Sequence, residues 1–162
     1  TRVYAFTDGK KDWSTYSNAL KTGKSFVTNG PILDFKVGGI MPGGTITSEK
    51  TVKWRLDVHS ALAVDSVEVI MNGNVIWKGK GLNKPGTKSY EGEINLPLGG
   101  WIAARAMGGE IIWPAMDSYP FAHTSPIWID YVGSADINSK KISTFSRERL
   151  NVSVALTYIS AM

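Results

Sequence analysis

Residues able to carry acid–base or metal chemistry are few in this sequence. It contains two histidines and no cysteine. His59 lies on the polar side of an alternating stretch and is predicted to be a solvated surface residue. His123 lies in the segment "GGEIIWPAMDSYPFAHTSPIW", which we interpret as a long loop, and such loops are often functional. One hypothesis is therefore an enzyme that uses His123 with a carboxylate such as Asp117. The alternative role for His123 is a hydrogen bond that anchors the loop.

The carboxylates and glycines form no recognised catalytic pattern. Glu91 and Glu93 are two residues apart in a predicted strand, so they share one face, and a solvated face explains them better than acid–base work. The sequence has no HxH or HExxH motif, no cluster of acidic residues with ligand spacing, and no GxSxG or P-loop. We therefore expect no metal and no cofactor in this chain.

Six tryptophans suggest a second kind of site. Exposed indole rings can stack on sugar rings, although tryptophan on sandwich strands more often packs in the core. Trp54 is predicted to be in the core from its alternation, and Trp13 falls on the apolar stripe of a predicted helix. Trp113, beside Pro114 in the long loop, is the best candidate for an exposed aromatic binding residue.

The charge and composition exclude several classes of protein. The 162 residues carry a net charge of +4, and the basic residues are scattered rather than clustered on one face, which argues against a nucleic-acid partner. No apolar run approaches the roughly 20 residues needed to span a bilayer, so no membrane partner is expected. The absence of cysteine excludes disulfides but says little about the cellular compartment.

Periodicity predicts the fold. The segment 12–23 has helical spacing, with Trp13, Tyr16, Ser17 and Leu20 on one stripe, Asp12 as N-cap and Gly23 after the last turn. Most other segments alternate as strands, and Asn72-Gly73 is a favoured hairpin pair. Together these signals predict one mainly β domain over 1–162. It would be an antiparallel, immunoglobulin-like β-sandwich with one N-terminal helix and a C-terminal helix.

The segment after Gly133 has a different pattern of apolar residues. Helical spacing over roughly 138–150 favours a helix within a tail at 134–162, although Val152, Val154 and Leu156 could alternate as a strand.

The stretch "SFVTNGP" at 25–31 raises a separate question. It reads as a strand that turns through Asn29-Gly30 into Pro31, where the proline lets the next strand begin without an N–H donor. A corner between two strands explains most of these residues. The alternative is a loop that presents Thr28 and Asn29 to a neighbour.

A series of segments resembles one known family. In chain order they are "RVYAF", "NALKTGKSFVTNGPILDFKVGG", "MPGG", "VEVIMNGNVI", "GWIAARAMG" and "FAHTSPIWI", and "GKSFVTNGP" is the most specific. They resemble the C-terminal β-sandwich domain of the carbaryl-hydrolase-like branch of the PHP (polymerase and histidinol phosphatase) metallohydrolases. These are bacterial proteins with an N-terminal metal-dependent hydrolase domain. The likeness extends to about residue 132.

The resemblance implies an accessory role. The family's metal ligands belong to the N-terminal domain, and none of their motifs occurs here, so this chain alone would not be an enzyme. It would be part of a longer protein that needs a divalent metal, and its partner would be the catalytic domain of the same polypeptide. A periplasmic or secreted location is favoured over a cytoplasmic one, and the oligomeric state stays open. The candidate pocket or interface residues are Thr28, Asn29, Gly30, Arg105, His123 and Thr124.

Two further expectations follow. A domain that docks on a partner should expose a large apolar patch, and helix 12–23 and loop 108–125 are the candidate segments for it. The alternative function is a free-standing β-sandwich module that binds carbohydrate or another protein.

Overall fold

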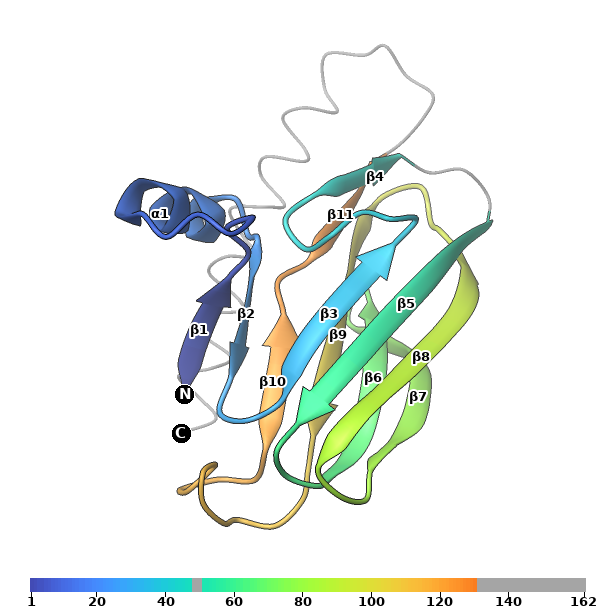
Figure 1. Cartoon of the computed structure of the whole chain (residues 1–162). Helices are drawn as coiled ribbons and strands as arrows, with labels where there is room; N and C mark the ends of the chain where they lie inside the picture. Colours follow the sequence, from blue (N-terminus) through green and yellow to red (C-terminus); the bar gives the residue numbers. More distant parts are fainter. Residues whose placement is uncertain (48–50, 131–162) are drawn as a thin grey trace. The chain divides into compact units, whose positions relative to one another are not determined.

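The computed structural model describes residues 1–47 and 51–130. Within them, one helix and eleven strands follow each other along the chain (Figure 1). Their bounds are β1 (Arg2–Ala5), α1 (Trp13–Lys21), β2 (Ser25–Thr28), β3 (Ile32–Val37), β4 (Thr45–Thr47), β5 (Thr51–Ser60), β6 (Val64–Met71), β7 (Asn74–Leu82), β8 (Gly86–Asn95), β9 (Gly100–Met107), β10 (Phe121–Thr124) and β11 (Ile127–Asp130). The predicted C-terminal helix and tail lie outside the described residues.

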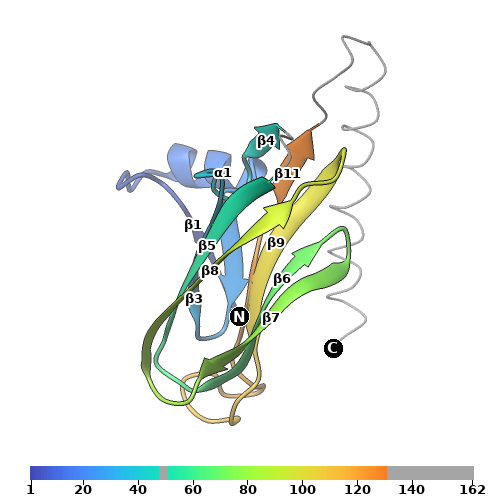
Figure 2. The same cartoon turned by 90° about the vertical axis from the view of Figure 1, so that its right-hand side faces the viewer.

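Two sheets pack face to face, and Figure 2 shows them as two layers. The larger sheet runs β1-β2-β10-β9-β6-β7. On the edge of β9 that faces away from β6, β10 pairs with the second half of β9 and β11 pairs with its first half, and β4 pairs with β11. β10 and β11 therefore lie end to end along one edge of β9. The smaller sheet runs β3-β5-β8. The described part of the chain is a β-sandwich, as predicted.

The core lies between the layers and follows the predicted alternation. On the smaller sheet, Leu33, Phe35 and Val37 alternate with polar residues along β3, and all three are fully buried. Trp54, Leu56 and Val58 do the same on β5. They pack against inward-facing residues of the larger sheet, namely Val67, Val69, Ile102, Ala104 and Ala106. Because only one face of each strand is buried, the register of these strands is fixed. A slip by one residue would turn every apolar side chain outward.

Local signals place the turns where the sequence predicts them. Asp12 caps α1, and its side chain accepts a hydrogen bond from the N–H of Thr15 (2.8 Å). Gly23 follows the helix with a positive φ of 75°, as expected for the residue that ends it. Asn72 and Gly73 both have positive φ, which a two-residue type I′ hairpin turn requires.

One expectation was wrong. The segment 108–125 is not all loop, because β10 occupies residues 121–124 and places His123 in a strand. The described strand pairs are antiparallel except for β4 and β11, which are parallel. Helix α1 exposes part of its apolar stripe, as expected of a candidate segment for an exposed apolar patch. Trp13 is 78% exposed, and Ala19 is the buried residue of the helix.

No helix in the described ranges is long and apolar enough to cross a bilayer.

Candidate functional site: an anchored apolar loop

The segment 108–120 connects β9 to β10 at the lower end of the view in Figure 1. We call it the apolar loop, because most of its large side chains are apolar and exposed. They are Ile111, Ile112, Trp113, Met116 and Tyr119. Trp113 is 79% exposed, as its position beside Pro114 predicts. This loop is a concentration of exposed apolar surface at one end of the sandwich.

The loop has internal order. The N–H groups of Ala115 and Met116 both donate to the carbonyl oxygen of Ile112, at 2.9 and 3.0 Å, and form a compact turn. Ala115 is buried beneath this turn. At the start of the loop, the N–H of Gly109 donates to the carboxylate of Asp65 (2.9 Å). The exposed side chains are therefore displayed from a backbone held by hydrogen bonds.

Asn29, in the "SFVTNGP" corner, fixes the far end of the loop. Its side-chain NH₂ donates to the hydroxyl of Ser118 (2.9 Å) and to the carbonyl oxygen of Tyr119 (3.0 Å). Its side-chain oxygen accepts from the N–H of Phe121 (2.7 Å). Gly30 lies against the side chain of Pro120. The corner is thus the support of the apolar loop, which the sequence alone did not reveal.

The two candidate threonines serve the fold internally. The hydroxyl oxygen of Thr28 lies 2.6 Å from the carbonyl oxygen of Pro31 and 3.0 Å from that of Phe121, and it accepts from the N–H of Gly30. The hydroxyl of Thr124 accepts from the N–H of Ala104 (3.0 Å). Both side chains are buried on the core side of the larger sheet. Neither presents its hydroxyl group to a ligand in this conformation.

Arg105 and His123 lie on the opposite, outer face of the same sheet. Strand register places Val27, His123, Arg105, Glu68 and Lys78 in one row across five neighbouring strands. The structure therefore brings the candidate segments onto adjacent strands. It does not bring them onto one surface, because the threonines point inward and Arg105 and His123 point outward.

Glu68 is the centre of this row, and it is a residue that the sequence analysis missed. Its side chain is 5% exposed, yet it binds two cations. One carboxylate oxygen accepts from Nε of Arg105 (2.7 Å) and lies 2.6 Å from Nη2, and the other lies 3.0 Å from Nζ of Lys78. Burial opposes ionisation, but the hydrogen bonds from Lys78 and Arg105 prevail and lower the pKa of Glu68. The alternation of side chains along a strand could have placed Glu68 on the outer face, because its neighbours Val67 and Val69 face the core.

One hydrogen bond fixes the tautomer of His123 and leaves Nε2 as its basic nitrogen. Its Nδ1 lies 2.7 Å from the carbonyl oxygen of Thr124, and because a carbonyl only accepts, Nδ1 carries the proton. Burial lowers the pKa of His123, and the neighbouring charge of Arg105 adds to that effect. Asp117 is exposed in the apolar loop, and no hydrogen bond joins it to His123 within the described residues. The pairing that an enzyme hypothesis needs is not formed in this conformation.

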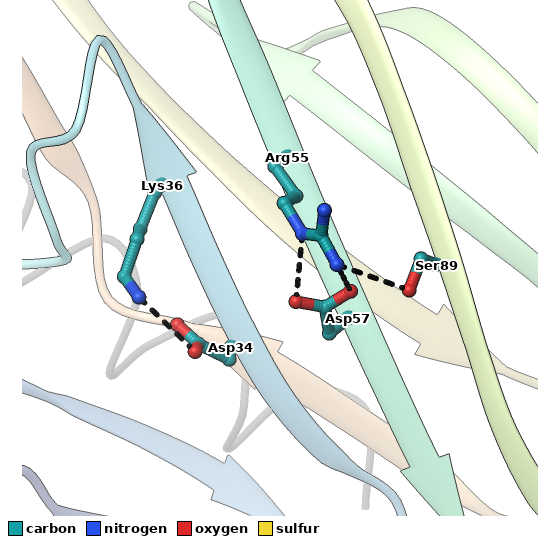
Figure 3. Close-up of polar contacts among 5 residues, drawn as sticks. All are labelled: Asp34, Lys36, Arg55, Asp57 and Ser89. Carbon is teal, nitrogen blue, oxygen red and sulfur yellow. Dashed lines mark hydrogen bonds and ion pairs between the residues drawn. The ribbon is translucent and has the colours of Figure 1, made fainter.

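The outer face of the smaller sheet is a charged surface of a different kind (Figure 3). Register places Asp34 opposite Asp57 and Lys36 opposite Arg55, so like charges face each other across β3 and β5. Each charge is compensated along its own strand instead. Lys36 binds Asp34 (3.2 Å), and Arg55 grips both oxygens of Asp57 (3.0 Å each). The hydrogen bond from Arg55 is the main reason that the pKa of Asp57 is lowered.

Nothing in the described residues forms a metal site. No group of three or more His, Asp or Glu side chains is arranged to hold an ion within residues 1–47 and 51–130. His59 lies on the exposed face of β5, as predicted, where its Nδ1 is 2.8 Å from the hydroxyl of Thr87. The arrangement therefore offers surfaces for binding and lacks an assembled catalytic centre in the part of the chain that is described.

Comparison with known proteins gives only distant likenesses. No protein-family model and no curated protein matches the sequence. The CARDB domain of PF1109 from Pyrococcus furiosus is similar in structure, with 15% identity and a TM-score of 0.41, over 63% of this chain and 97% of that domain. The C-terminal domain of Wzt is similar at 13% identity and a TM-score of 0.39, over 69% of this chain and 80% of that chain. Because both scores are below 0.5, the fold assignment rests on the strand pairing above.

Proposed function

We propose that this chain is a non-catalytic accessory domain that docks through the apolar loop onto a PHP-type metal-dependent hydrolase domain of the same polypeptide. The observation that carries the proposal is the apolar loop itself, with five large exposed side chains on a hydrogen-bonded backbone. Exposed large apolar side chains gathered on one short segment are typical of an interaction site. The identity of the partner comes from the family resemblance of "GKSFVTNGP" and the motifs around it.

Pre-organisation supports a docking role. An ordered loop loses less conformational entropy on binding than a flexible loop does. More of its contact energy therefore remains as affinity. The bonds made by Asn29 and Asp65 hold both ends of the loop before any partner arrives. The exposed tryptophan supplies the kind of anchor on which interface energy usually concentrates.

The same geometry suggests which candidate residues would lie near the partner's substrate pocket. Asn29 and Gly30 sit directly beside the loop and would reach the interface first. Arg105 carries a permanent charge able to bind a carboxylate or phosphate, but in the free domain Glu68 occupies it. Thr28 and Thr124 would contribute through the backbone that they hold in place.

The first test is the sequence of the full gene product. We expect a domain with HxH- and DxH-type metal motifs upstream of Thr1. An open reading frame that starts near Thr1 would contradict the proposal directly.

The second test uses that full polypeptide. We expect Trp113→Ser to weaken docking, seen as faster hydrogen–deuterium exchange in the loop and a lower thermal midpoint of the whole protein. Trp13→Ser is the matched control, because Trp13 is equally exposed but lies at the other end of β2. Equal effects of the two substitutions would remove the loop from the interface.

The alternative function is a free-standing module that binds carbohydrate, and the 79% exposure of Trp113 is the observation that favours it. Binding on a glycan array that is lost in Trp113→Ala and kept in Trp13→Ala would establish this function instead. A third outcome concerns catalysis. The purified chain, supplied with Mn²⁺ or Zn²⁺, should not turn over generic esters or phosphates. Turnover that disappears in His123→Gln would overturn the non-catalytic assignment.

A further inference from the structure

Helix α1 exposes an apolar arc that the rest of the described domain leaves uncovered. Trp13, Tyr16 and Leu20 are spaced three and four residues apart, which places them along one side of a helix. Trp13 and Leu20 are exposed and Tyr16 is half-buried. The rings of Trp13 and Tyr16 lie 5.8 Å apart and form one continuous aromatic surface. This arc is separate from the apolar loop, because register places α1 at the Ser25 end of β2 and the loop at the Thr28 end.

Lysines flank the arc on both sides. Lys10 and Lys11 precede the helix, and Lys21 and Lys24 stand at its end, and all four are exposed. No ion pair joins any of them to a carboxylate within the described ranges. Asp8 and Asp12 are also exposed here, and the hydrogen bonds from Thr15 lower the pKa of Asp12, so that it stays ionised. Four lysines against two carboxylates leave an excess of two positive charges, so the surface around α1 is basic as well as aromatic.

The apolar loop has the opposite charge. Between residues 108 and 120 the charged side chains are Glu110 and Asp117, and no lysine or arginine occurs there. An anionic surface would attract α1 and repel the loop, so the two apolar surfaces are suited to different partners.

We propose that α1 is a peripheral attachment site for an anionic lipid bilayer. Trp13 and Leu20 enter the boundary between headgroups and acyl chains, and the four lysines lie among anionic headgroups. Amphipathic helices with tryptophan and leucine on one side and lysine on the polar side bind bilayers in this way, and basic residues next to such a helix add attraction to anionic lipids. The acyl chains of a bilayer can bury the apolar arc, whereas a soluble polyanion could only neutralise the charge of the lysines. The proposal is independent of the docking function, and a helix that lies on a membrane needs no spanning segment.

The experiment measures binding of the whole chain to vesicles by sedimentation. Vesicles of phosphatidylcholine mixed with phosphatidylglycerol should bind it at low salt, and pure phosphatidylcholine vesicles should not. Replacing Lys10 and Lys21 by glutamine should lower the partition coefficient about fivefold for each lysine, because one basic residue near an anionic leaflet is worth that factor. Trp13→Ala should lower it about tenfold through the lost apolar area.

Trp113→Ala is the control and should leave vesicle binding unchanged. A thermal unfolding curve for each variant separates loss of binding from loss of folding, and all the substituted side chains are exposed. The proposal is overturned if the chain does not bind the mixed vesicles, or if Trp113→Ala reduces binding as much as Trp13→Ala. It is also overturned if Trp13→Ala has no effect, which would indicate a purely electrostatic site for any polyanion.

Discussion

Glu68 illustrates how one side chain can organise a surface. A buried carboxylate is costly unless its charge is compensated, and here the compensation comes from Arg105 and Lys78 on the two adjacent strands. The three side chains connect β9, β6 and β7 on the side of the sheet that faces away from the core. This arrangement fixes where Arg105 points, and so decides whether it is available to a ligand.

Glu68→Gln should destabilise the domain by about 1–3 kcal/mol. The expected loss is below that of a fully buried pair, because Arg105 and Lys78 keep contact with water and are left only partly uncompensated. The free energy of unfolding from urea titration measures it. Glu93→Gln is the control, because its partner Lys53 is 4.0 Å away and both side chains are exposed, so about 0–1 kcal/mol is expected. Equal losses for the two substitutions would show that Glu68 has no special role.

His123 should make stability depend on pH in mildly acidic solution. Its pKa in the folded state is lowered below the ordinary value of about 6.5, chiefly by burial. The unfolded chain therefore binds the proton more readily, and the free energy of unfolding should fall as pH drops below about 6.5 towards the lowered value. Urea titrations at several pH values should show this slope in the wild type and a smaller one in His123→Gln. A slope that is unchanged in His123→Gln would contradict the assignment.

The apolar loop and the corner that supports it form the next level of organisation. Sequence alone identifies both segments as unusual, but it gives no sign that Asn29 holds Ser118, Tyr119 and Phe121. The reason is physical, since a side-chain amide can bond to any backbone within reach, and about ninety residues separate the two segments. Only the pairing of β2 with β10 brings them together.

Asn29→Ala should loosen the loop while the sandwich stays folded. The substitution removes three hydrogen bonds and leaves the N–H of Phe121 without its acceptor, for which a cost of about 1–3 kcal/mol is expected. Hydrogen–deuterium exchange should become faster at 110–121 and change little in β5. Asn95→Ala removes a single exposed bond to Thr51 and serves as the control. Unchanged exchange in the loop would mean that its own turn at Ile112 is enough to order it.

Other elements show which sequence signals are sufficient. β3 and β5 could be predicted residue by residue, because strict alternation leaves one choice of buried face. β10 could not, because its four residues directly follow Pro120 and are separated from Pro126 by Ser125 alone, and two prolines so close together are typical of a loop. The stripe of α1 was found, but helical spacing shows only that residues share a side. It does not show that anything covers that side.

At the scale of the molecule, the class of fold could be predicted and the topology could not. Many short alternating segments with turn residues between them indicate a sandwich whatever their order. The pairing of β2 with β10 and of β4 with β11 depends on segments far apart in the chain, and no local pattern encodes it. The hypothesis that the candidate residues share one surface accordingly had no local signal behind it, and their division between two faces of one sheet could not be foreseen.

The two exposed tryptophans make the two ends of the domain chemically different. Trp13 and Trp113 lie towards opposite ends of β2, in basic and acidic surroundings respectively. If each surface binds the partner proposed for it, the domain is a spacer that holds a hydrolase domain away from a lipid surface. The rigidity of the sandwich between them would then set that distance.

The attachment of β1 and β2 through β10 has a consequence for synthesis on the ribosome. Within the described strands, β2 pairs only with β1 and β10, so residues 2–28 have no further sheet to join until residues 122–124 have been made. At about 5–20 residues per second, the wait lasts roughly 5–20 seconds. Throughout that interval β1 and β2 can pair only with each other. Phe26, which is buried in the folded domain, and its ring neighbour Tyr4 therefore have no further strand beside them. The first two strands of this sandwich to be made are thus among the last to gain all their sheet partners, and this part of the domain is where a nascent-chain chaperone would have the most to protect.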